Sequence, residues 1–480
     1  MKALFYSIYN TCIPVLGTEL EIMSNHLEKG DEVYVLRCHG ELEYCDINPD
    51  HNENICYKCN KFFYENIRKI NLPKKNVLKI PKFEVNYNEL PDVFKNLQEL
   101  KEFNLNGIKY GLAIASTLIS EYKDHELSTI LHRRKIHRLL RTSYFTYNFS
   151  QNILKKIKPD CLYHQGGRSS NIFPVFKACQ ELGIDSYSIN NAGILDKYAL
   201  YKNNILHNAN ILSQEMIDLW DKSSENKEEI GAKWFIDKRN GVDSYQLSYT
   251  KNQKRDSLPV NFDVSKKNIA IFNSSIYEYA AIEGWENPIY EDELDGLKKI
   301  FESFKNDTDI KFYLRIHPNL KDQNNSQMQE LKKISSINYP NLEIIWPEEL
   351  IDSYALVNAC DKILVFLSTI GIEACFWEKP SILAGNSPYS GLDCCYKPKT
   401  HEELIKLLKY NLVPKDKQEA LKYGYWNLTR GIFYKRYEPK NIYEGTFLGQ
   451  DLKIKISAID NLICKLSVKI KKFLNINKIK

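Results

Sequence analysis

The stretches Y-L-R-I-H-P-N at 313–319 and V-F-L-S-T-I-G-I-E-A at 365–374 decide the fold of this chain. In each, an apolar run typical of a buried strand ends abruptly in small or polar residues. The first stretch places Arg315, His317 and Asn319 where its strand ends. Two such strand ends are typical of an α/β sheet that holds the phosphate of a nucleotide at one edge.

The second stretch runs from its strand through Ser368 and Thr369 into a helix that carries Glu373. Hydroxyl groups and unpaired backbone N–H groups at a helix N-terminus favour a phosphate group. Serine and threonine are also ordinary helix caps, and an acidic residue in the first turn also compensates the helix dipole. We expect Ser368 and Thr369 to contact phosphate and Glu373 to bind ribose hydroxyl groups.

Strand and helix patterns alternate around both stretches. Five strand-like runs with helices between them predict a complete Rossmann-like domain over 261–445. Its first strand ends in Asn273, Ser274 and Ser275, which we expect to line the phosphate site, with a simple polar turn as the alternative. No G-x-G-x-x-G follows a strand and no G-x-x-x-x-G-K-[ST] is present, which argues against dinucleotide redox chemistry and P-loop chemistry.

The N-terminal half predicts a second domain of the same class over 1–260. A strand at 3–9 precedes a helix whose start we place at Thr18, because Thr18 and Glu21 fit a capping box. The stretch D-C-L-Y-H-Q-G-G-R-S-S at 160–170 repeats the passage from a strand through a glycine loop to a helix. The polar, aperiodic residues 222–266 are expected to form the crossing between the domains.

Length and charge exclude some classes of protein. At 480 residues the chain is too long for one ordinary core, so two domains are expected. The net charge is +5, but 451–480 holds eight Lys against Asp451 and Asp460, so the remainder has 5 − 6 = −1. A body without a basic field is a poor nucleic-acid binder, and we expect no nucleic-acid partner.

The C-terminal residues 446–480 predict a basic amphipathic helix. Such a helix packs on the N-terminal domain, lies on anionic lipid, or simply has a solvated basic face. The chain shows no signal peptide and no apolar run of about 20 residues. We expect a cytoplasmic protein, with the inner face of the cytoplasmic membrane as a peripheral location.

Four of the 12 cysteines lie close together in an insertion at 38–59. Cys38, Cys45, Cys56 and Cys59 form the pattern C-x6-C-x10-C-x2-C, which is able to supply a closed tetrahedral zinc site. The spacing is irregular, so free thiols remain an equal alternative and an iron–sulfur cluster a third. Such a zinc ion would be structural, and no cofactor is expected at the catalytic centre.

The motifs of the C-terminal half resemble those of known families. An H-P pair followed by a later S-S/T pair is similar to the motifs of bacterial sialyltransferases and capsule Kdo transferases. The strings I-A-I-F-N-S-S-I-Y-E-Y at 269–279, R-I-H-P-N at 315–319 and K-P-S-I-L-A-G-N-S-P-Y at 379–389 together resemble surface-carbohydrate biosynthesis proteins. The resemblance implies a GT-B fold, with two Rossmann-like domains facing a cleft and a nucleotide sugar, CMP-linked in those families, held by the C-terminal one. It also implies that His317 and the pair Ser368-Thr369 contact the phosphate.

The catalytic base is then expected in the N-terminal domain. Inverting transfer needs a carboxylate or a histidine to deprotonate the acceptor hydroxyl group. Glu19 or Glu21 beside the first loop is one choice, and His164 is the other. Ordinary loop geometry explains these residues equally well.

The glycine loop after the 160–165 strand supplies a candidate acceptor or anion site. Gly166 and Gly167 would let the backbone approach a ligand closely, and Arg168 would bind an anionic sugar.

We therefore expect a glycosyltransferase of capsule or lipopolysaccharide assembly. Its partners would be a nucleotide-sugar donor and a glycan or lipid-linked glycan acceptor. Two alternatives remain: a teichoic-acid-type polyol-phosphate transferase, and a capsule assembly or export protein with the same fold and no catalysis.

Overall fold

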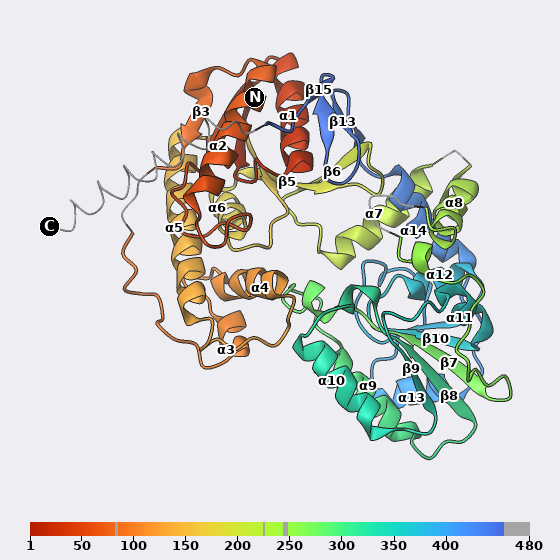
Figure 1. Ribbon diagram of the computed structural model, residues 1–480. Coiled ribbons are helices and arrows are strands. Elements are labelled where there is room, and N and C mark those ends of the chain that lie inside the picture. Colours follow the sequence, from red (N-terminus) through yellow and green to blue (C-terminus); the bar gives the residue numbers. More distant parts are fainter. Residues whose placement is uncertain (82–84, 224–225, 243–247, 456–480) are drawn as a thin grey trace. The chain divides into compact units, whose positions relative to one another are not determined.

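The computed structural model describes residues 1–81, 85–223, 226–242 and 248–455 (Figure 1). These residues form two compact units. Unit 1 holds Met1–Thr117, Ser128–Leu206 and the described residues from Gly431 onward. Unit 2 holds Leu118–Leu127 and His207–Arg430. Residues 207–260, which the sequence pattern placed in the first domain, thus belong to the second unit, and the chain returns to unit 1 at its end.

Unit 1 is built on a seven-stranded sheet of order β12-β6-β5-β4-β1-β2-β3. Five neighbouring strands are parallel, and β6 and β12 extend the sheet in the antiparallel sense. The strands are β1 (Lys2–Ser7), β2 (Glu32–Arg37), β3 (Val77–Lys79), β4 (Cys161–Gln165), β5 (Asp185–Asn191), β6 (Lys197–Lys202) and β12 (Ile432–Phe433).

Helices cover both faces of this sheet. Successive residues of β1 point to opposite faces, so Phe5 belongs to one apolar core and Leu4 to another. The first core includes residues of α1 and α2, and the second includes residues of α5 and α6. The helices of this part of the chain are α1 (Ile13–Glu28), α2 (Glu53–Ile67), α3 (Leu97–Glu102), α4 (Tyr110–Tyr122), α5 (Arg133–Ile157) and α6 (Phe173–Leu182).

Helix α1 begins five residues earlier than the capping box predicted. Pro14 occupies the first turn, where its fixed φ fits a helix and its missing N–H is not needed. Thr18 is therefore inside the helix, and its hydroxyl donates to the carbonyl of Pro14 at 2.7 Å. Glu21 is also fully buried, and it accepts from Arg436 Nη1 at 3.0 Å and from the backbone N–H of Tyr437 at 3.0 Å. Glu21 thus fastens the segment at Arg436 and Tyr437 to α1, which leaves Glu19 as the glutamate near the first loop.

Unit 2 contains the complete Rossmann-like domain that the sequence predicted. Its five strands are all parallel, in the order β11-β10-β7-β8-β9. Helices α9, α10 and α13 share one large apolar core with the sheet. The strands are β7 (Lys267–Phe272), β8 (Ile310–Arg315), β9 (Leu342–Ile345), β10 (Lys362–Val365) and β11 (Ser381–Leu383). The helices are α9 (Glu293–Phe304), α10 (Ser326–Ile337), α11 (Ser353–Ala359), α12 (Ile370–Phe376) and α13 (His401–Lys409). The α/β class with two Rossmann-like sheets is confirmed.

Three further helices complete unit 2: α7 (Ala209–Lys222), α8 (Lys227–Arg239) and α14 (Lys417–Thr429). Helix α8 lies in the segment that the sequence suggested was an irregular crossing. It packs on α14 at two glycines: a Cβ on Gly424 would lie 2.1 Å from the carbonyl oxygen of Gly231. The sequence did not predict α8, because its apolar and polar residues are not separated onto two faces. Its packing on α14 depends instead on the close approach of the two helix backbones.

A small sheet of β13 (Tyr437–Pro439), β14 (Gly445–Phe447) and β15 (Gln450–Asp451) packs against α1 in unit 1. A Cβ on Gly17 would lie 2.3 Å from the ring of Tyr437. We expected a basic helix over 446–480. The first residues of that range belong to β14 and β15 of this sheet, and residues 456–480 lie outside the described residues. None of the helices described here is long and apolar enough to cross a bilayer.

Candidate functional site

The carboxyl edge of the unit 2 sheet gathers most of the predicted donor-site residues. From β7 the chain adds β8 and β9 on one side and then β10 and β11 on the other, so the order reverses between β7 and β10. Ligands of open α/β sheets bind outside the carboxyl ends of the strands at such a point. Residues 273–275 follow β7, 317–319 follow β8 and 368–369 follow β10. The three adjacent strands β10, β7 and β8 therefore present these segments along one edge.

Asn273 and His317 are joined directly across two of these strands. The side-chain oxygen of Asn273 accepts the backbone N–H of His317 at 2.7 Å. Asn273 is 1% exposed, so this bond is shielded from water and fixes where the β8 end lies relative to the β7 end. The hydroxyl of Ser275 lies 3.3 Å from Nδ1 of His317.

The imidazole of His317 has a defined tautomer. Its Nδ1 accepts the backbone N–H of Asn319 at 3.1 Å, so the ring proton of the neutral form is on Nε2. Burial, with the nearby charge of Arg315, lowers the pKa of His317 to about 4. At neutral pH the ring is therefore an uncharged N–H donor. Tyr249 packs edge-on against it with ring centroids 5.4 Å apart.

Asn319 links this histidine to two further side chains. Its side-chain oxygen accepts from the Tyr249 hydroxyl at 2.5 Å, and its amide donates to Glu278 at 2.8 Å. Glu278 is exposed, while Asn319 is partly buried. The carboxyl edge of the sheet near His317 is thus bordered by Tyr249 and by the carboxylate of Glu278, which a polar ligand is able to reach.

Glu293 is a residue of this edge that sequence reasoning missed. It lies in the first turn of α9, is 1% exposed, and accepts the backbone N–H of Ser274 with both oxygens, at 2.9 and 3.2 Å. The hydroxyl of Tyr279 donates to it at 3.1 Å. Burial raises the pKa of Glu293 to about 8. Its place one residue after the cap Asp292 looks like ordinary dipole compensation, which is why the pattern did not distinguish it.

Ser368, Thr369 and Glu373 are brought together at the start of α12. Ser368 Oγ accepts the backbone N–H of Ile370 at 3.3 Å, while the Thr369 hydroxyl donates to Glu373 at 2.8 Å instead of capping the helix. Tyr354 also donates to Glu373, which is 4% exposed. Both serine and threonine remain partly exposed. The pair lies at the expected edge, whereas Glu373 has two protein partners already.

Arg315 lies away from this group. Its guanidinium donates to the carbonyl of Trp346 at 2.6 Å and to that of Glu349 at 3.0 Å, and the residue is 3% exposed. These bonds hold the connection that follows β9. Arg315 influences the edge through its charge, which disfavours protonation of His317.

Unit 1 has its own reversal of strand order, between β1 and β4. Glu19 lies there, 2% exposed, with Oε2 2.5 Å from the hydroxyl of Ser7 at the end of β1. That hydroxyl is also 2.8 Å from the side-chain oxygen of Asn10. Burial raises the pKa of Glu19 to about 7, against the opposing hydrogen bonds from Ser7 and Gln165. A carboxyl group that titrates near neutrality is suited to general base catalysis.

His164 is the residue before the last of β4, and its ring centroid lies 5.7 Å from that of Phe176 on α6. It is fully buried, and within the described part of the chain neither ring nitrogen has a hydrogen-bond partner. Burial lowers the pKa of His164 to about 4. His164 is therefore neutral at pH 7, and the pKa of Glu19 suits a general base near neutral pH better than the pKa of His164 does.

Both glycines of the loop after β4 have a positive φ. Gly166 and Gly167 have φ of +59° and +142°. A Cβ on Gly167 would also lie 2.3 Å from Cγ2 of Ile205, so no larger residue fits. The Gly166 carbonyl accepts from the Ser188 hydroxyl. Arg168 follows as a partly exposed side chain.

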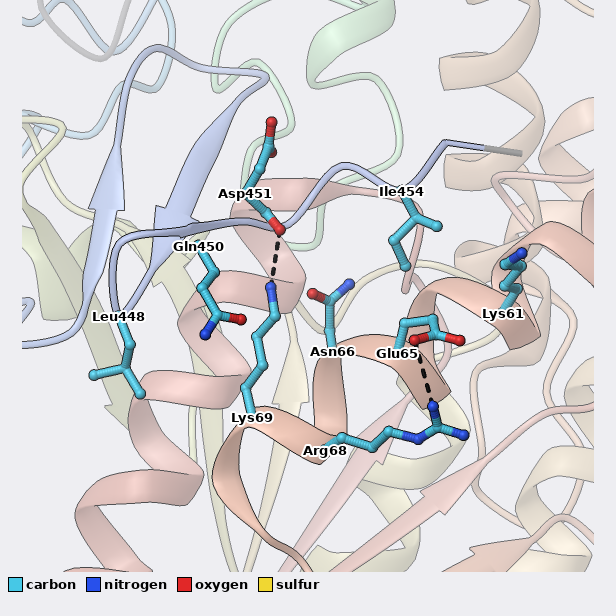
Figure 2. A pocket seen from close by; sticks show the side chains of 9 residues that line it. All are labelled: Lys61, Glu65, Asn66, Arg68, Lys69, Leu448, Gln450, Asp451 and Ile454. Atoms are coloured by element: carbon cyan, nitrogen blue, oxygen red, sulfur yellow. Dashed lines mark hydrogen bonds and ion pairs between the residues drawn. The ribbon is translucent and has the colours of Figure 1, made fainter. Parts of the chain in front are cut away.

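The four clustered cysteines line one cavity of about 20 Å³ in unit 1. A larger cavity of about 610 Å³, also in unit 1, lies between α2 and the chain around β15 (Figure 2). There Lys69 donates to the carbonyl of Asp451 at 2.8 Å, and Arg68 pairs with Glu65. It contains none of the residues predicted for catalysis or donor binding.

One group of three possible metal ligands lies in unit 2. Ligand atoms of His125, Glu126 and Asp292 lie within 4.8 Å of one another. Asp292 already caps α9 by accepting the backbone N–H of Asp295, and the Glu126 side chain is 66% exposed. This group was not anticipated from the sequence, because Asp292 is far from His125 and Glu126 in the chain.

No family model and no curated protein matches this sequence. Among solved structures it is similar to the KpsC β-Kdo 2,4-transferase of Thermosulfurimonas dismutans, with 12% identity, 55% of this chain and 79% of that chain covered, and a TM-score of 0.35. It is also similar to the UDP-GlcNAc 2-epimerase of Neisseria meningitidis bound to UDP-GlcNAc, with 12% identity, 89% and 97% covered, and a TM-score of 0.27. A third similar structure is the UDP-GlcNAc 2-epimerase of Methanocaldococcus jannaschii in complex with UDP-GlcNAc and UDP. The identity is 14%, 88% of this chain and 98% of that chain are covered, and the TM-score is 0.26. Similarity this low carries no argument about function, and the α/β class rests on the two sheets themselves.

Proposed function

We propose that this chain is a GT-B-type glycosyltransferase of surface-polysaccharide assembly, using a nucleotide-activated sugar. The observation that carries the proposal is the edge of unit 2. Three adjacent parallel strands end there in Asn273–Ser275, in His317 and Asn319, and in Ser368 and Thr369. Small hydroxyl residues and an N–H donor at a switch point suit the phosphate of a nucleotide.

His317 would act on the leaving phosphate as a neutral donor. Its Nδ1 is occupied by the Asn319 N–H, so Nε2–H is the group that is able to reach a ligand oxygen. A hydrogen bond that strengthens as charge develops on the departing phosphate lowers the barrier to transfer. A donor already oriented by Asn273 and Asn319 does not have to reorganise during the reaction.

Glu19 would serve as the general base in unit 1. When its carboxyl group is ionised, Oε2 accepts from Ser7, and when it is protonated it donates to Ser7, whose own proton then points to Asn10. This chain of groups accommodates both protonation states of Glu19. Deprotonation of the acceptor hydroxyl is the step that a base with a pKa near 7 would assist.

The donor nucleotide would be identified by thermal denaturation with CMP, CDP, UDP and GDP. A ligand at about 100 times its Kd stabilises the native state by about 2.7 kcal/mol. We expect one nucleotide to raise the Tm of the natural chain and to lose this effect in His317→Ala. His401→Gln is the matched control, since His401 is on α13 with Tyr290 as its partner.

A measurement of turnover distinguishes sugar transfer from nucleotide binding alone. With the sugar donor of the nucleotide identified, His317→Ala should release nucleotide at least about 100-fold more slowly while its folding is unchanged. Equal rates for His317→Ala and the natural chain would overturn the assignment. Nucleotide binding with no turnover for any acceptor would favour a non-catalytic carbohydrate-binding protein, and turnover of CDP-glycerol alone would favour a polyol-phosphate transferase.

A further inference from the structure

The connection between β2 and α2 brings four cysteines to one small cavity. Cys38 follows β2 directly, Cys45 lies in the connection, and Cys56 and Cys59 are three residues apart on α2. Residues three apart on a helix are neighbours on the same face. All four line the cavity of about 20 Å³, whose apolar walls include Leu42 and Ile55.

The sulfur atoms of this cavity accept N–H groups from the surrounding chain. The backbone N–H of Gly40 lies 3.2 Å from Cys38 Sγ, and the amide of Asn48 lies 3.2 Å from Cys56 Sγ. The amide of Asn10 donates to Cys59 Sγ at 3.8 Å. Donors aimed at sulfur are the arrangement that stabilises thiolates held by a metal ion.

A buried cation lies beside the same sulfur atoms. Arg37 is fully buried, and its guanidinium carbon lies 4.1 Å from the ring centroid of Phe63. One nitrogen donates to the Cys38 carbonyl at 3.1 Å and to Asn60 at 2.7 Å, but Nε and Nη1 have no acceptor within the described residues. A buried positive charge with unused donors requires compensating negative charge nearby. Four thiolates around a divalent cation carry a net charge of −2 and would supply it.

We propose that Cys38, Cys45, Cys56 and Cys59 bind one thiophilic divalent cation, of which Zn²⁺ fits best, as a structural site. Binding deprotonates the four thiols and releases their protons, and the four sulfurs fill the coordination shell, so no position remains for catalysis. A cavity of about 20 Å³ has room for one ion.

Loading draws the four sulfur atoms together. Among the described His, Cys, Asp and Glu residues, only the His125 group already brings three ligand atoms within 4.8 Å of one another. Zinc–sulfur bonds are about 2.3 Å long, so the cysteine ligands have to approach a common centre. The connection that carries Cys38 and Cys45 contains turns and no helix or strand between Arg37 and Glu53, so the approach of these two cysteines to α2 would not break a helix or a strand.

The site would order the loop that faces the end of β1. Asp46, next to Cys45, accepts from the hydroxyl of Tyr9, which also lies 3.3 Å from Ser169 Oγ. Asn10, which approaches Cys59, is the group that accepts from Ser7 beside Glu19. The metal is thus inferred to support the loop around Glu19 without touching a substrate, and this role is independent of whether the chain is a glycosyltransferase.

Metal content of the full, tag-free chain tests the proposal. Mass spectrometry of elements in protein purified without chelators should find about one zinc per chain. The double variant Cys56→Ser/Cys59→Ser should lose it. Cys12→Ser is the matched control, because Cys12 is also a half-buried cysteine of unit 1 and should keep the metal.

A second measurement uses the natural chain alone and does not depend on the folding of a variant. Reconstitution with Co²⁺ under reducing conditions should give the intense visible bands of a tetrahedral tetrathiolate site, and mercurial titration should release the ion as four thiols react. No bound metal together with no cobalt bands would overturn the proposal. Iron with acid-labile sulfide would overturn the single-ion site in favour of a cluster.

Discussion

The hydroxyl of Ser7 lies 2.5 Å from Oε2 of Glu19, where β1 ends and beside the point at which the strand order of unit 1 reverses. Two effects on the pKa of this carboxyl group oppose each other. Burial raises its pKa, and the hydrogen bonds from Ser7 and Gln165 lower it, with a result of about 7. The contact therefore sets how much of Glu19 is ionised at neutral pH.

Transfer activity should follow the ionisation of Glu19. A general base works in its ionised form, so activity should rise as the pH increases through about 7 and level off above it. Glu19→Gln should lower kcat by about 10² to 10⁴ above pH 7, since the amide has a similar shape but accepts no proton, and the difference should narrow at lower pH, where Glu19 is itself protonated. Glu32→Gln, an exposed change on β2, is the control. A Glu19→Gln variant with normal kcat would exclude Glu19 as the base.

Ser7→Ala should shift the pH profile and not merely lower it. Loss of the Ser7 hydrogen bond removes a contribution that lowers the pKa of Glu19. The midpoint of the rising limb should then move above about 7, and the loss of rate should be recovered at higher pH. A structural role alone would lower the rate without moving the midpoint, so the complete pH–rate profile of both proteins decides between the two.

The free energy of unfolding should depend on pH through Glu293. Its pKa is about 8 in the folded chain and 4.5 as an unperturbed group, so the folded state holds a proton that the unfolded state loses between these values. This stabilising contribution is complete below about pH 4.5 and is lost as the pH rises through 8. Glu293→Gln, which needs no proton, should be more stable than the natural chain at pH 9, by about 5 kcal/mol for a shift of about 3.5 pKa units at 1.36 kcal/mol per unit.

Urea unfolding of the natural chain and Glu293→Gln at pH 5 and pH 9 measures this difference. The gap between the two proteins should be small at pH 5 and larger at pH 9. Glu302→Gln on the exposed face of the same helix should show no such trend. A gap that is constant with pH would mean that Glu293 is ionised in the folded chain across this range.

The sheets could be predicted because their signals are local. The runs 269–272, 312–314 and 363–367 are continuously apolar, as buried parallel strands are, and each is followed directly by a polar residue. For the same reason the sequence placed Asn273, His317 and Ser368 at strand ends, where the structure has them.

What the sequence missed depends on contacts between distant residues. Arg315 is the last residue of the strand that His317 follows, yet its guanidinium donates to carbonyl groups 31 and 34 residues further along the chain. Glu293 looks like a first-turn acid, and only burial against Ser274 distinguishes it. The early start of α1 depends on Pro14, whereas the capping-box pattern at Thr18 is matched by chance within the helix. The return of the chain to unit 1 after Arg430 has no local signal at all.

Lys362 offers a stability prediction that is independent of function. It is 2% exposed at the start of β10, and its ammonium group donates to the carbonyls of Leu407, Leu408 and Tyr410 at the end of α13. These carbonyls have no later turn of helix to satisfy them, so Lys362 acts as a buried cap. Lys362→Met would fill most of the space but leave several acceptors without a donor, at a cost of about 3 kcal/mol in the free energy of unfolding.

Lys267→Met is the matched control, since Lys267 donates to the Lys409 carbonyl of the same helix end from an exposed position and should cost less than about 1 kcal/mol. Equal losses for the two variants in urea unfolding would show that the ammonium group of Lys362 is not what holds the end of α13.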